Sequence, residues 1–137
     1  MPNSEHRLQA KIFIEIWNTM PETHGFLFST FQETLTPAEG AIKKSLGLVA
    51  GVSDMIYITP KKEMIGIELK APDSYHKVVH IIAQAQWLIN VPNKGYFCDS
   101  LEMAKKIING EEGIDPKKVL DYALSLKTES MKWLKEF

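Results

Sequence analysis

Two short apolar runs separated by a tight turn constrain the fold of this chain most strongly. Residues 54–59 and 64–69 are rich in β-branched and other apolar side chains, and a short turn opened by proline lies between them. This pattern predicts a β-hairpin. Asp54 stands at the start of the first strand, and Glu68 and Lys70 stand at the end of the second. The hairpin would therefore bring two carboxylates and an ammonium group to one edge of a sheet.

Two carboxylates and a lysine are groups that metal-dependent cleavage of a phosphodiester bond requires. Carboxylate oxygens suit Mg²⁺ or Mn²⁺, which keep several waters and bind substrate phosphate as well. The backbone carbonyl of Leu69 would add a further oxygen. Lys70 would orient the attacking water or stabilise charge in the transition state. The set Asp54, Glu68 and Lys70 is therefore a candidate metal-dependent active site.

The spacing of Glu68 and Lys70 is weak support when it is taken alone. An acidic residue two positions before a lysine arises about once by chance in a chain of this length. The chain has a second instance, Asp115 and Lys117, which more simply marks the start of a helix. In a strand, positions 68 and 70 point to the same face. A charge pair on a solvated face of an edge strand is the alternative, and the residues themselves leave it open.

The remaining pattern predicts a mixed α/β fold. Helical periodicity and capping residues alternate with short apolar or aromatic runs that read as strands. A small mixed central sheet flanked by α-helices on both faces follows from that order. The predicted elements besides the hairpin are a helix from Ser4 to Met20, a strand over 26–31, a helix from Thr36 to Gly47, a helix over 78–91, a strand over 96–98, a helix over 101–108 capped by Ser100, and a last helix from Asp115 that continues or breaks before Met131.

Composition sets limits on the class of protein. A chain of 137 residues suits one domain. Cys98 is the sole cysteine, which excludes an internal disulfide and a multi-cysteine zinc site and is typical of a reducing compartment. No apolar run approaches the roughly 20 residues of a membrane span. We therefore expect a cytoplasmic protein with no membrane partner. The net charge of −1 provides no global basic field for nucleic acid.

Several other polar residues have both a structural and a functional interpretation. Glu5 either complements the dipole of the first helix or supplies a further metal ligand, and Gln9 lies one turn on, on the same face. Gln84 and Gln86 interrupt an apolar helix; one of them is a candidate for pointing into a site, the alternative is an exposed face, and for Gln86 we favour the exposed face. Three other interpretations are simpler: a surface or substrate-facing role for His76 and His80, which stand at an i, i+4 spacing, a core position for Cys98, and the packing of a terminal helix for Trp133.

The order and spacing of these residues resemble a known nuclease family. Gly51-Val52-Ser53-Asp54, then Ile67-Glu68-Leu69-Lys70-Ala71-Pro72, then Gln84 and Gly95, look like the motifs of the VRR-NUC domain. Upstream, Glu5, Gln9 and the run Lys44-Ser45-Leu46-Gly47-Leu48 also fit. VRR-NUC is a branch of the PD-(D/E)xK, or restriction-endonuclease-like, superfamily. The resemblance runs from about Glu5 to Ile108, and Ser53 stands where the superfamily often has proline.

The resemblance implies a restriction-endonuclease-like core and assigns a role to each matching residue. Residues 1–110 would form the nuclease core, and residues 111–137 a C-terminal helical extension packed on the same single domain. Candidate metal ligands, for Mg²⁺ or Mn²⁺, are Asp54, Glu68, Glu5 and the Leu69 carbonyl. Lys70 would be the catalytic lysine and Gln84 the family's motif glutamine. Candidate DNA contacts are Lys44, Lys77 and Gln9.

By the same resemblance, the chain would be a metal-dependent DNA endonuclease that selects branched DNA. Small stand-alone members of the family, from phages and bacteria, resemble Holliday-junction resolvases, so a homodimer acting on a junction inside a bacterial cell is the expectation. Two alternatives stay open. One is a non-catalytic nucleic-acid-binding or assembly protein on the same fold. The other is a sequence-specific restriction endonuclease, for which the chain has little room for base-reading loops.

Overall fold

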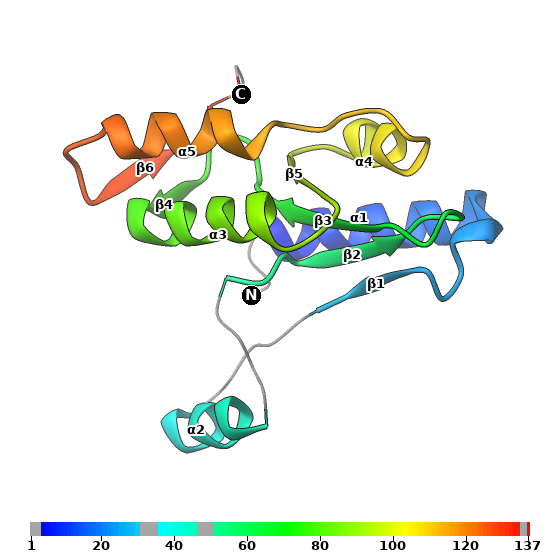
Figure 1. Cartoon of the computed structure of the whole chain (residues 1–137), viewed down its shortest axis with the longest axis horizontal. Helices are drawn as coiled ribbons and strands as arrows, with labels where there is room; N and C mark the ends of the chain where they lie inside the picture. Colours follow the sequence, from blue (N-terminus) through cyan, green and yellow to red (C-terminus); the bar gives the residue numbers. More distant parts are fainter. Residues whose placement is uncertain (1–3, 31–35, 47–50, 135–136) are drawn as a thin grey trace.

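A mixed four-stranded sheet forms the centre of the protein (Figure 1). The computed structural model describes residues 4–30, 36–46, 51–134 and 137. The strand order is β1-β2-β3-β5, with β3 parallel to β5 and the other two pairs antiparallel. Their bounds are Leu27–Ser29 for β1, Met55–Ile58 for β2, Met64–Leu69 for β3 and Lys94–Cys98 for β5. The predicted α/β fold with a small mixed sheet flanked by helices is confirmed at this level.

Strands β2 and β3 form the predicted hairpin. Met55 pairs with Ile67 and Ile58 pairs with Met64, so the two strands run in register over the whole of β2. The turn is closed by a hydrogen bond from the backbone N–H of Lys62 to the carbonyl of Thr59, at 2.8 Å. Asp54 therefore lies immediately before β2, opposite the end of β3 that carries Glu68.

Helices cover both faces of the sheet. On one face α1 (Ser4–Thr19) and α4 (Leu101–Ile108) pack their buried side chains against alternate residues of β3. On the other face α3 (Val78–Asn90) and α5 (Pro116–Ser125) form a second core with Phe97 of β5. The alternation of a strand assigns Ile65, Ile67 and Leu69 to the first core, so Glu68 faces the side of α3.

The close approach of α3 to β5 depends on Gly95. A Cβ atom at this position would lie 2.3 Å from the backbone carbonyl oxygen of Leu88, a distance that real contacts do not reach. The chain passes from β3 through α3 to its parallel neighbour β5, which is a crossover connection. Glycine at 95 thus lets α3 pack directly on the sheet.

A second, two-stranded sheet was not predicted. Strand β4 (Tyr75–Lys77) pairs antiparallel with β6 (Ser130–Lys132). This pairing places the segment just before α3 beside the C-terminal segment. Trp133 follows β6 and is only 1% exposed, with its ring 5.1 Å from that of Phe97. The prediction of Trp133 on a terminal helix is therefore wrong. Residues 111–137 hold α5 and β6, and their buried side chains share one core with α3.

Two predicted helix starts are confirmed by their caps. The side chain of Thr36 accepts a hydrogen bond from the Glu39 backbone N–H at the start of α2 (Pro37–Ser45), and Ser100 caps α4 in the same way through Met103. A 3-10 turn, η1 (Pro21–Thr23), follows α1. Two expected element ends lie outside the described residues: Gly47 for α2 and Phe31 for the first strand.

Among the described helices, none combines the length and the apolar character needed to cross a membrane.

Candidate active site

The residues predicted to act together line one pocket of about 220 Å³ at the edge of the central sheet. Five segments contribute to it: the start of α1, the residue before β2, the end of β3, strand β4 and helix α3. The lining residues are Glu5, His6, Gln9, Asp54, Glu68, Leu69, Lys70, His76 and Gln84. Every candidate catalytic or metal-binding position from the sequence is in this set.

Glu68 and Lys70 form a buried ion pair. Their exposed fractions are 3% and 4%, and Lys70 Nζ lies 3.5 Å from Glu68 Oε2. Strand β3 lies between β2 and β5, so it is a central strand of the sheet. The alternative of a solvated charge pair on an edge strand is therefore excluded. Burial raises the pKa of Glu68 well above its ordinary value of 4.5, the negative charge of Asp54 raises it further, and Lys70 offsets part of the increase.

Asp54 is fixed against the end of β3. Its Oδ2 accepts a hydrogen bond from the backbone N–H of Leu69 at 2.9 Å. Gly51, with a φ of +85°, turns the chain into this position, a conformation that glycine adopts without strain. Ser53 is fully buried and donates to the carbonyl of Met55 at 3.0 Å, while Thr30 Oγ1 donates to the carbonyl of Ser53. Serine at 53 is thus accommodated without an unpaired hydroxyl.

Glu5 reaches the pocket from the first turn of α1. Its carboxylate is partly buried, and burial raises its pKa, with Lys70 opposing this effect and Asp54 adding to it. Oε1 of Glu5 is buried, and His76 Nε2 lies 3.1 Å from it. Glu5 therefore lines the site and does more than face solvent at a helix terminus.

His76 lines the site although it was not among the predicted site residues, and only a surface or substrate-facing role was expected for it. Its Nε2 lies 3.1 Å from Glu5 Oε1 and 2.6 Å from Ser74 Oγ. Burial lowers the pKa of His76 to about 4, and the positive charges of Lys70 and His80 contribute. His76 lies on β4 whereas His80 lies on α3 and is exposed, so the two do not form a pair on one helix. His76 is thus a neutral imidazole at neutral pH, facing a carboxylate.

Gln84 and Gln86 separate as predicted. Gln84 lines the pocket, and its Oε1 is buried with no hydrogen-bond partner in the described structure. Gln86 is exposed on the opposite side of α3. Because buried polar atoms are nearly always paired in proteins, an unpaired amide oxygen aimed into a pocket marks a place where a ligand or water completes the contact.

The three candidate DNA contacts are distributed unevenly. Gln9 lines the pocket and donates from its amide to Ser29 Oγ at 2.9 Å. Lys44 is exposed on α2, which stands apart from the sheet and its helices (Figure 1). Lys77 is exposed on β4 and is not part of the pocket wall. The structure thus brings Gln9 to the site and leaves Lys44 and Lys77 outside it.

The donor atoms of the pocket suit a hard divalent cation. Glu5, Asp54 and Glu68 bring three carboxylates against the single ammonium of Lys70, and Gln84 adds an unpaired amide oxygen. Mg²⁺ and Mn²⁺ prefer oxygen ligands of this kind. Within the part of the chain that the structure describes, no three His, Cys, Asp or Glu side chains are already arranged as a coordination group. The chemistry of the donors fits the metal, whereas their geometry is not that of an assembled metal centre.

Cys98, considered in the sequence as a core residue, is fully buried beside this region. Burial raises the pKa of its thiol to about 12, so it is protonated at neutral pH, as a core residue would be.

Comparisons with protein-family models, curated proteins and solved structures returned no match to this chain. The likeness to the VRR-NUC domain accordingly rests on the sequence motifs.

Proposed function

We propose that the protein is a Mg²⁺- or Mn²⁺-dependent DNA endonuclease of the VRR-NUC type, with a restriction-endonuclease-like core. The observation that carries this proposal is the burial of Glu68 and Lys70 beside Asp54 in one pocket. Charged residues are almost never fully buried without a reason, and a stability role is weak because desolvation offsets their attraction. A catalytic role accounts for keeping them there.

Each residue of the pocket has a defined part in the proposed reaction. Asp54, Glu68 and Glu5 would hold the metal, with the Leu69 carbonyl beside them. Lys70 is an ammonium donor next to these carboxylates, where it would orient the attacking water and stabilise charge on the phosphate oxygens. Gln84 would direct its unpaired amide oxygen at the same water or at the metal's hydration shell. When bound, the metal polarises the scissile phosphate and lowers the pKa of a bound water.

The expected substrate is branched DNA, and the expected active form is a homodimer in the cytoplasm of a bacterial cell. Both expectations come from the likeness to stand-alone VRR-NUC proteins that resemble Holliday-junction resolvases. Two copies would supply two sites for two strands of one junction. The near-neutral net charge of −1 is consistent with recognition by local shape and contacts, since a basic field would draw in any duplex.

A digestion series tests the proposed activity. Supercoiled plasmid, linear duplex, flap, splayed arm and four-way junction would each be incubated with Mg²⁺, Mn²⁺ or a chelator. We expect cleavage with either metal, fastest on a branched substrate, and none with the chelator. Equal cleavage with the chelator, or no cleavage of any substrate with either metal, would refute the proposal.

A second candidate is a protein of this fold that binds nucleic acid or a partner without cutting. It is favoured by the lack, among the described residues, of three acidic or His/Cys side chains already set for a metal. Calorimetric titration with Mn²⁺ distinguishes the two. Binding that disappears in Asp54→Asn supports the nuclease, whereas no binding at millimolar concentrations supports the non-catalytic protein.

A further inference from the structure

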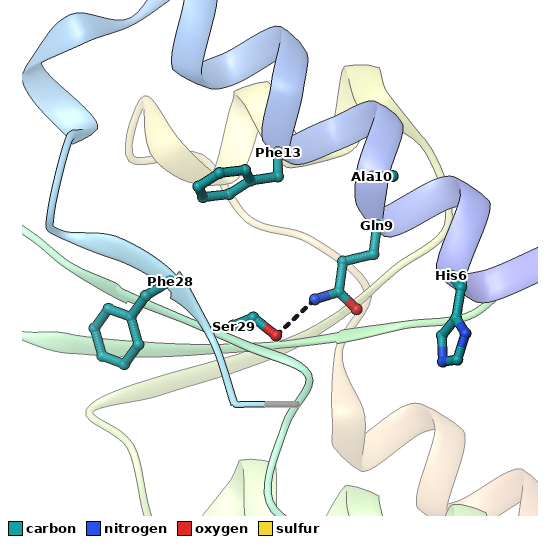
Figure 2. Close-up of a pocket in the computed structure, with 6 residues that line it drawn as sticks. All are labelled: His6, Gln9, Ala10, Phe13, Phe28 and Ser29. Atoms are coloured by element: carbon teal, nitrogen blue, oxygen red, sulfur yellow. Dashed lines mark hydrogen bonds between the residues drawn. The ribbon is translucent and has the colours of Figure 1, made fainter. Parts of the chain in front are cut away.

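A second pocket, almost wholly apolar, lies between α1 and β1 (Figure 2). Its volume is about 410 Å³, within the range of roughly 300–1,000 Å³ typical of small-ligand sites. Phe13 of α1 and Phe28 of β1 both line it, and the hydrogen bond between Gln9 and Ser29 joins the two elements (Figure 2). The lining residues are His6, Gln9, Ala10, Phe13, Phe28 and Ser29.

This pocket adjoins the acidic one. His6 and Gln9 line both, so the two cavities share a wall formed by the first turns of α1. One side of that wall carries the carboxylates and Lys70, and the other carries the two phenyl rings. A single ligand with a charged group and an aromatic group joined by a short linker would occupy both.

A nucleotide has this construction, because one sugar connects its phosphate to its base. We propose that the apolar pocket receives an unpaired nucleobase of the nucleotide next to the scissile phosphate. This inference rests on the proposed nuclease function and names the substrate feature that the site selects. Phe28 is 43% exposed, so its ring is open to stack on a base, as aromatic side chains do in proteins that bind single strands.

The pocket would select against intact duplex. A base within a duplex is stacked and paired, and moving it into a protein pocket costs unstacking and unpairing, least where the base is already single-stranded. DNA at a flap, a splayed arm or the crossover of a junction offers such a base beside a phosphate. The amide of Gln9, held by Ser29 at the shared wall, lies where it would contact the base edge or the sugar.

The competing occupant is a second copy of the chain. Trp17 is an exposed apolar residue outside the pocket wall, and its ring lies 5.8 Å from that of Phe13, so a protein partner on this surface would cover Trp17 together with the pocket. A base needs only the pocket. Phe26 is 53% exposed and belongs to the same segment as Phe28, which makes it a matched control for the loss of one exposed phenyl ring.

The test combines removal of the base with removal of the ring. On the branched substrate that the parent cuts fastest, the nucleotide on either side of the mapped cut would be replaced by an abasic analogue. We expect the abasic substrate to be cut about 5- to 150-fold more slowly by the parent, the range that stacking of one base provides. Phe28→Ala should cut the intact substrate with a similar loss and show little further loss when the base is removed.

Phe26→Ala should keep the parent's dependence on the base, and Phe28→Tyr, which retains the ring, should do the same. Circular dichroism would establish that each variant is folded.

Equal rates of the parent on intact and abasic substrates would overturn the base-binding pocket while leaving the nuclease in place. Equal losses in Phe26→Ala and Phe28→Ala, or a Phe28→Ala defect that follows dissociation of a dimer in sedimentation, would assign the surface to a second copy instead. Failure of the parent to cut any DNA with Mg²⁺ or Mn²⁺ would refute the nuclease itself, and the pocket assignment with it.

Discussion

The chain contains the same local pattern, an acidic residue two positions before a lysine, in two very different environments. Glu68 and Lys70 end a central strand, are almost completely buried and lie 3.5 Å apart. Asp115 and Lys117 begin α5, are both exposed, and meet through a hydrogen bond from the Lys117 backbone N–H to Asp115 Oδ1 at 3.0 Å. The first pair involves two side chains in a pocket, whereas the second is a helix cap.

The difference between these pairs comes from their surroundings. Around Glu68 the sheet and α3 exclude water, and Asp54 adds a second negative charge, so the pKa of Glu68 rises. Around Asp115 solvent screens the side chains and the helix N-terminus supplies the partner. An acidic residue and a lysine at this spacing therefore form a buried ion pair in one place, where we propose metal chemistry, and a helix cap in the other. Substitutions made in parallel at both sites test this contrast.

The largest difference is expected in cleavage. Lys70→Ala removes the donor beside the three carboxylates and should lower the cleavage rate about 10²- to 10³-fold, as the loss of one stabilising donor does in other active sites. Lys117→Ala should cut at the parent rate because its side chain is exposed and outside the pocket. Rates on the preferred substrate, with both variants confirmed as folded, provide the measurement. Comparable losses in the two variants would remove the distinction.

The next effect concerns metal binding and stability. At an Mn²⁺ concentration 100-fold above its dissociation constant, binding to the folded state should raise the free energy of unfolding of the parent by about 2.7 kcal/mol. Glu68→Gln should lose most of this increase, since it removes a ligand charge, and Asp115→Asn should retain it. Thermal melting with and without Mn²⁺ measures both. A parent melting temperature that is indifferent to Mn²⁺ would contradict the metal site.

The buried pair should also make stability depend on pH in the absence of metal. The pKa of Glu68 is higher in the folded than in the unfolded protein, so the folded state favours its protonated form. Its contribution to stability is full below about pH 4.5 and is lost as the pH rises through the folded-state pKa. Glu68→Gln should therefore be more stable than the parent at neutral pH, because it removes the buried charge that ionisation of Glu68 would create. Urea unfolding at several pH values between acidic and neutral provides the free energy of unfolding of both proteins. If that free energy changes with pH in Glu68→Gln as it does in the parent, the assignment is wrong.

The smallest effect belongs to the helix cap. Asp115→Ala leaves the first N–H groups of α5 without a side-chain acceptor and should cost about 0.5–2 kcal/mol of stability. Cleavage by this variant should match the parent under conditions where both are folded. A loss of activity in Asp115→Ala without a loss of stability would show that this end of α5 contributes to the site directly.

Elements that depend on local patterns were predictable from the sequence. The hairpin follows from two β-branched runs and a turn, and the caps at Thr36, Ser100 and Asp115 follow from residue type and spacing. The meeting of Asp54 with the end of β3 is a consequence of that hairpin. The inward direction of Gln84 follows from its place on an otherwise apolar helix, because a polar group there needs a partner.

Features that depend on contacts between distant segments were not predictable. Strand β4 exists because β6, near the C-terminus, pairs with it, and no periodicity near Tyr75–Lys77 indicates this. His76 enters the site only through that pairing, so a local i, i+4 pattern with His80 suggested the wrong geometry. Trp133 was expected to pack on a terminal helix, yet the strand before it and the contact with Phe97 determine its place. The apolar pocket between α1 and β1 likewise joins two separate segments.

Single-turnover cleavage by Asp54→Asn tests the central claim most directly. Asparagine has an amide oxygen that can accept the Leu69 N–H in place of the Asp54 carboxylate oxygen. The local structure at the end of β3 is therefore retained while one negative charge is removed. We predict that the parent cuts a branched DNA in the presence of Mg²⁺ or Mn²⁺ and that folded Asp54→Asn cuts it at least about 100-fold more slowly. Cleavage by Asp54→Asn at the parent rate would contradict the assignment of this pocket as a metal-dependent nuclease site.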